Sequence, residues 1–121
     1  MRPFVVNGEV WRVVWVTPDD PRLIDRTNTR TVATTDPVAK VIHMSTELSP
    51  PDLDLVMLHE VAHAITMSYG LLEEVHGAVP EPYWIPVEEW AAQLVGEHAI
   101  EAVILSSELL GRPLCVGGFC S

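Results

Sequence analysis

The segment from Ser49 to Gly70 constrains the fold most, because it reads as one helix that is apolar around most of its circumference. Ser49 and Pro50 are typical of a helix start, and Gly70 is a natural left-handed stop. The apolar residues between them share no single face: Leu53, Val56, Leu58, Val61, Ala62, Ile65 and Met67. A helix with this pattern is largely buried. The sequence therefore predicts a central helix over residues 50–69.

Polar residues interrupt this apolar helix in the order His59-Glu60-Val61-Ala62-His63, an H-E-x-x-H motif. Side chains four residues apart lie on one helical face, so the two imidazoles can bind a single zinc ion. Glu60 lies about 100° round the helix, where it is a poor ligand but can take a proton from a water molecule beside the metal. Because unpaired histidines and carboxylates are costly to bury, this motif favours a zinc site over two histidines that are merely hydrogen-bonded.

Zinc in a hydrolase usually has three protein ligands and an open position for water. The candidates for the third ligand lie outside the helix: His43, Glu73, Glu74, His76, Glu81, Glu88, Glu89, Glu97 and His98. A second helical pattern runs from Pro86 to Leu110, and Glu88 lies on its mostly apolar stripe with Ala91, Val95, His98, Ala102 and Leu105. Glu89 lies on the neighbouring face with Ala92, Gly96, Ile100 and Val103. We expect Glu88 to be the third ligand and keep Glu89 as the alternative.

The order H-E-x-x-H, a gap, and Glu88-x-x-Ala91-Ala92 resembles the gluzincin branch of the zincin metallopeptidases. The short gap is similar to that of compact bacterial and phage members, such as the ImmA/IrrE-like proteases. Over residues 36–105, the resemblance implies a Zn²⁺-dependent peptidase with Glu60 as general base. It also implies a strand before the helix that aligns the substrate, and we expect Val38–Met44 to be that strand, with an open edge. Those proteases often carry Asn four residues after the ligand Glu, where this chain has Ala92 or Gln93.

Strand patterns precede the helical patterns along the chain. Asn7-Gly8 separates two apolar segments and predicts a β-hairpin of Phe4–Val6 with Glu9–Val16. Further strand patterns follow at Thr31–Thr34 and Val38–Met44. This order predicts one α+β domain over residues 1–121, with a small, mostly antiparallel sheet, an active-site helix and a long C-terminal helix.

Charge is distributed unevenly along the chain. Residues 1–40 hold six basic and five acidic residues, a net of +1, whereas residues 41–121 hold one basic and twelve acidic residues, a net of −11. The negative half repels nucleic-acid backbones, so we expect a polypeptide substrate and no direct nucleic-acid partner. Every apolar run is too short to span a membrane, and the first residues lack a signal-peptide pattern. We expect a cytoplasmic protein, or a virion-associated one if it is phage-encoded.

Cys115 and Cys120 lie in an apolar tail that could dock on a protein partner. Their spacing permits a loop disulfide, but free thiols are the expectation for a cytosolic protein. The alternative to an enzyme is a zinc-stabilised, non-catalytic interaction module, such as a phage structural or regulatory protein. A fourth protein ligand from His43, His76 or the Cys tail would favour the module, whereas only an enzyme needs Glu60.

Overall fold

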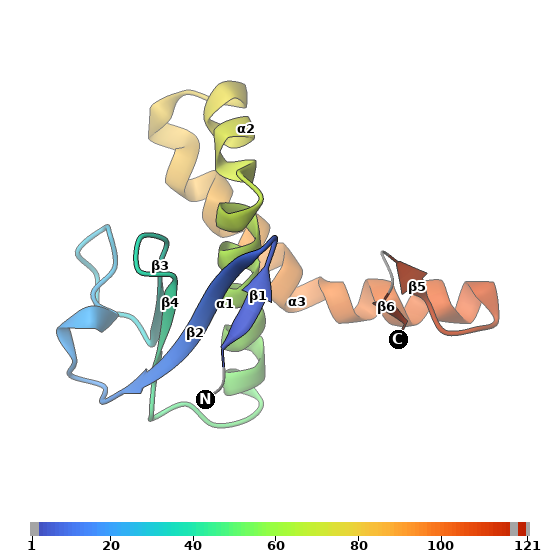
Figure 1. Cartoon of the computed structure of the whole chain (residues 1–121), viewed down its shortest axis with the longest axis horizontal. Helices are drawn as coiled ribbons and strands as arrows, with labels where there is room; N and C mark the ends of the chain where they lie inside the picture. Colours follow the sequence, from blue (N-terminus) through green and yellow to red (C-terminus); the bar gives the residue numbers. More distant parts are fainter. Residues whose placement is uncertain (1–2, 117–118, 121) are drawn as a thin grey trace.

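The computed structural model describes residues 3–116 and 119–120, and Figure 1 shows a small sheet packed on a helix, followed by two more helices. The strands are β1 (Phe4–Val6), β2 (Glu9–Val16), β3 (Ala33–Asp36), β4 (Val41–Ser45), β5 (Cys115–Val116) and β6 (Phe119–Cys120). The helices are α1 (Asp52–Ser68), α2 (Leu71–Ala78) and α3 (Trp84–Leu110), with short 3-10 turns η1 (Pro21–Leu23) and η2 (Glu81–Tyr83). The predicted combination of a small sheet, a central helix and a long C-terminal helix is confirmed.

The four-stranded sheet is mixed, with the order β1-β2-β4-β3. β1 and β2 are antiparallel, as are β3 and β4, but the central pair β2 and β4 is parallel, with Val14 opposite His43. The prediction of a mostly antiparallel sheet is therefore wrong at its centre. The reason is that the chain leaves β2 through a long connection containing η1 and then forms β3, so β4 enters the sheet in the same direction as β2.

The prediction of an open edge at Val38–Met44 is wrong. The strand begins only at Val41, after a turn over residues 37–40, and β4 is paired on one side with β2 and on the other with β3. All five residues of β4 are buried, which is the usual environment of a central strand. The edge strands of this sheet are β1 and β3 instead, and both contact α1.

The core lies between the sheet and α1. Its buried residues are Trp11, Val13, Ala33, Ile42, Met44 and Ala64. The Trp11 Nε1–H donates a hydrogen bond to Ser68 Oγ at 2.7 Å, and the Asn7 side-chain amide donates to the Ser68 carbonyl at 3.0 Å. The predicted hairpin is confirmed, with positive φ at both Asn7 and Gly8. These contacts fix the hairpin to the C-terminal end of α1.

The helix bounds differ from the prediction at their starts. α1 begins at Asp52 rather than at Pro50, without the side-chain cap expected from Ser49. It ends near Gly70 as predicted, and the left-handed Gly70 is the N-cap of α2, a helix that the sequence patterns did not indicate. No single helix among residues 3–116 meets the length and hydropathy needed to cross a membrane; α1 and α2 meet them only together, and they are bent by 84°.

Candidate metal centre

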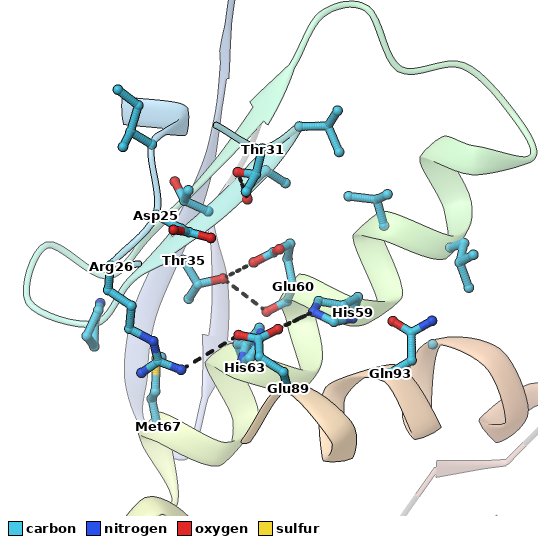
Figure 2. Close-up of a pocket in the computed structure, with 18 residues that line it drawn as sticks. Asp25, Arg26, Thr31, Thr35, His59, Glu60, His63, Met67, Glu89 and Gln93 are labelled. Carbon is cyan, nitrogen blue, oxygen red and sulfur yellow. Dashed lines mark hydrogen bonds and ion pairs between the residues drawn. The ribbon is translucent and has the colours of Figure 1, made fainter. Parts of the chain in front are cut away.

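Three ligand-type side chains from α1 and α3 converge beside the sheet (Figure 2). The His59 and His63 Nε2 atoms are 3.2 Å apart, and the Glu89 carboxylate oxygens lie 3.2 Å from His59 Nε2 and 3.4 Å from His63 Nε2. Ligand atoms bound at about 2.0–2.1 Å by a tetrahedral zinc lie about 3.3–3.4 Å from one another. Each of these distances is close to the separation of two ligands of one zinc ion, although the two histidines face different oxygens of the Glu89 carboxylate.

Glu89 reaches the histidines because α3 crosses α1 closely at Gly96. A Cβ atom on Gly96 would lie 3.4 Å from the Leu55 carbonyl oxygen and 3.7 Å from His59 Cβ. Gly96 and Glu89 are seven residues apart, so they lie on the same face of α3. The face of α3 that packs on α1 is therefore the face with Glu89 and Gly96. This packing places the Glu89 carboxylate beside the two imidazoles.

Glu88, the expected ligand, lies elsewhere. Its side chain is 2% exposed, with one oxygen 3.0 Å from His76 Nε2 and the other 2.5 Å from Arg26 Nη2. Arg26 and Glu88 Oε2 form an ion pair. Among the described residues, no hydrogen bond reaches this oxygen. Arg26 also lies 3.6 Å from Glu89, and the His76 ring stacks on Trp84. The buried Glu88 carboxylate therefore links the loop before β3, helix α2 and helix α3 through two partners that are partly exposed.

His59, His63 and Glu89 form a triangle of potential ligands, and Glu60 points away from it toward β3 (Figure 2). It is 7% exposed, and the Thr35 hydroxyl donates a short hydrogen bond of 2.5 Å to its carboxylate. The same hydroxyl lies 3.4 Å from the Glu60 backbone carbonyl. A threonine on the edge strand therefore orients the side chain that the sequence selected as general base.

Glu89 and His59 shift each other's pKa. Hydrogen bonds from His59 and then His63 hold the pKa of Glu89 well below its usual range. The Glu89 carboxylate in turn raises the pKa of His59, more than partial burial lowers it. Glu89 is consequently ionised at neutral pH, which is the state in which a carboxylate binds metal.

The triangle and Glu60 line one cavity of about 610 Å³ between α1, α3 and the β3 side of the sheet. Its wall also includes Arg26, Thr35, Gln93 and apolar side chains such as Ile24 and Val56. A cavity of this size is typical of a ligand site that combines apolar walls with a few polar groups. The polar groups here include the two histidines, Glu60 and Glu89.

The other sequence candidates do not join the triangle. His43 lies on the side of the sheet that faces η1, where burial lowers its pKa. His76 is held by Glu88, and the remaining candidates are exposed: Glu73, Glu74, Glu81, Glu97 and His98. Cys115 is disulfide-bonded, contrary to the expectation of free thiols, and it stands opposite Cys120 in the β5–β6 pair. No sequence pattern pointed to Arg26 or Thr35, because neither belongs to a motif and both approach from loop and strand segments distant in sequence.

The chain matches no protein-family model, no curated protein and no solved structure in comparisons with known proteins.

Proposed function

We propose that this protein is a zinc-dependent metallopeptidase in which His59, His63 and Glu89 bind the metal and Glu60 is the general base. The observation that carries the proposal is the triangle of two Nε2 atoms and one carboxylate, with separations of 3.2–3.4 Å. The buried Glu60 lies beside it, on the same helix as the two histidines. Glu89 replaces Glu88 as the proposed third ligand, because Glu88 is already paired with His76 and Arg26.

The donor set fits zinc, since two imidazoles and one carboxylate form a known catalytic zinc site with room for water. A zinc ion bound there would act as a Lewis acid toward a water molecule and a carbonyl group. Glu60 would accept a proton from the attacking water and pass it to the leaving amine. The Thr35 hydroxyl bonds to the Glu60 carboxylate, so Thr35 would set the side of the cavity from which Glu60 approaches the water molecule.

The free edge of β3 supports a peptide as the substrate. Ser45 N–H donates to the Val32 carbonyl, and the register pairs Thr34 with His43. Because hydrogen-bonded pairs alternate along an antiparallel ladder, the backbone groups of Thr35 point away from β4. An extended peptide could pair with this edge directly beside Glu60.

The proposal is tested by comparing the parent protein with the variant Glu60→Gln. We expect both proteins to bind about one zinc ion per chain, since the three ligands are unchanged. Hydrolysis of a peptide library should fall about a hundredfold or more in the variant, because Gln cannot accept the proton. Equal cleavage by both proteins would show that Glu60 is not the base.

Zinc stoichiometry separates the enzyme from the alternative, a zinc-stabilised interaction module. Full zinc binding without cleavage of any peptide by the parent protein would support the module. A stoichiometry near zero, unchanged when His59 and His63 are both replaced by Ala, would contradict both functions. Among the described residues, three side chains are close enough to bind one metal ion. A closed structural zinc site needs a fourth protein ligand, so this number supports the enzyme.

A further inference from the structure

The C-terminal half of α3 extends away from the sheet and from α1, with the β5–β6 hairpin alongside it (Figure 1). One stripe of this helix has residues spaced alternately four and three positions apart, and we name it the α3 seam: Ala91, Val95, His98, Ala102, Leu105 and Leu109. Alternation of four and three residues is the spacing of the core positions in a two-stranded coiled coil. The seam therefore has the pattern of a helix that pairs with another helix.

The structure leaves this seam open to solvent. Val95 is 37% exposed, Leu105 is 50% exposed and Leu109 is 89% exposed. Leu114, directly before the hairpin, contacts a different side of the helix, where its backbone N–H donates to Ser107 Oγ. All seam residues except His98 are apolar, and a helix with such a stripe is normally covered. The described part of the chain lacks an element that covers it.

Charge beside the seam indicates what would cover it. Glu101 and Glu108 directly precede the seam residues Ala102 and Leu109, at the flanking positions where coiled-coil helices form ion pairs with their partners. α3 has five Glu and no Lys or Arg along its whole length. A second copy of this chain would bring more carboxylates and no cation to these positions, and the chain already carries a net charge of −10.

We propose that the α3 seam binds a helix of a partner protein that has apolar residues in a heptad repeat and Lys or Arg at the flanking positions. Apolar contacts along the seam would supply the affinity, and pairing with Glu101 and Glu108 would select a basic helix over an acidic one. This inference is independent of the proposed hydrolysis, because Leu105 and Leu109, the seam residues that the experiment changes, lie in the C-terminal part of α3, which projects away from α1.

The probe is a synthetic helix of three heptads with Leu at the core positions and Lys at the flanking positions, compared with a twin that has Glu at those positions. Binding is followed by fluorescence anisotropy of the labelled peptide. We expect the Lys peptide to bind at least about tenfold more tightly than the Glu peptide and to weaken as salt is added. In the double variant Leu105→Gln/Leu109→Gln, binding of the Lys peptide should weaken about tenfold or more.

The matched control is Ile100→Gln, which removes an apolar side chain that is 56% exposed but lies off the seam. This variant should bind like the parent, and circular dichroism should show that all variants keep the same helix content. Equal weakening in control and seam variants, equal binding of both peptides, or no binding of the Lys peptide would each overturn the proposal. Dimerisation of the parent in sedimentation experiments, abolished by the Leu105/Leu109 double variant, would also overturn it and make a second copy the occupant.

Discussion

The adjacent residues Glu88 and Glu89 provide a test in which one substitution should remove metal binding and the other should remove stability. Replacing Glu89 by Gln removes the negative charge that lies within 3.4 Å of both histidine Nε2 atoms. Replacing Glu88 by Gln removes the negative charge between Arg26 and His76 but leaves the triangle intact. The two substitutions are chemically identical, so they differ only in what each side chain contacts.

The expected losses of zinc affinity and stability follow from the burial of each Glu side chain and from whether it belongs to the proposed zinc site. Loss of a group that merely supports a metal ligand costs about 10–100-fold in affinity, so loss of the Glu89 ligand should weaken zinc binding by more than about 100-fold. The Glu89 side chain is 48% exposed, and exposed pairs contribute only about 0–1 kcal/mol to the stability of the metal-free protein. The Glu88 side chain is 2% exposed, and breaking a buried pair costs about 3–5 kcal/mol. Arg26 is partly in water, so we expect about 3 kcal/mol for Glu88→Gln, which corresponds to a fall in Tm of roughly 10 °C.

Two measurements on each variant provide the test. Tm is measured by circular dichroism on metal-free protein, and zinc affinity by competition with a chromophoric chelator at a temperature where both variants are folded. We expect Glu88→Gln to lose Tm with a change in zinc affinity of less than about tenfold, and Glu89→Gln to show the opposite pattern. Weaker zinc binding in Glu88→Gln than in Glu89→Gln would refute the assignment and return the ligand role to Glu88.

Three further predictions concern the same site. Gly96→Val should force α3 away from α1 and weaken zinc binding. The control is Gly77→Ala in α2, where a Cβ atom would meet open space; it should leave zinc affinity unchanged and raise stability by about 0.5–1 kcal/mol in denaturant unfolding. Because Glu89 raises the pKa of His59, zinc titrations should show affinity falling as the pH drops through a value above 6.5. In metal-free protein the same pair adds stability below pH 6.5 that is lost as the pH rises through the raised pKa. Glu89→Gln should move the fall in zinc affinity to lower pH and abolish the stability effect. Thr35→Val should lower kcat by about tenfold with unchanged zinc affinity, and an unchanged kcat would exclude a positioning role for this hydroxyl.

Local patterns predicted the parts of the structure that depend on neighbouring residues. The Asn7-Gly8 turn and the helix stop at Gly70 follow from backbone preferences, and both are confirmed. The proximity of His59 and His63 follows from helical geometry alone. These features needed no knowledge of the rest of the fold.

The remaining features depend on packing between distant segments. Glu88 and Glu89 differ by about 100° around α3, so the choice between them requires knowing which face meets α1. Gly96 was a usable signal for that face, because a glycine within a helix often marks a close approach. The parallel pairing of β2 with β4, and the approach of Arg26 and Thr35, depend on the path of the chain between residues 17 and 40, for which local patterns carry little information.

The way in which α3 is attached distinguishes it from the rest of the molecule. Only two residues of this long helix are buried, Glu88 and Ala92, whereas the apolar core is made by the sheet and α1. α3 therefore adds little to the buried apolar core, and a metal bound by His59, His63 and Glu89 would cross-link it to α1. Removing that metal should loosen α3 while the sheet keeps its packing, so that amide hydrogens of α3 exchange with solvent long before those of β4. Docking of the helix and completion of the metal site would then be a single event, and occupancy by metal would set how often the last helix of the chain detaches.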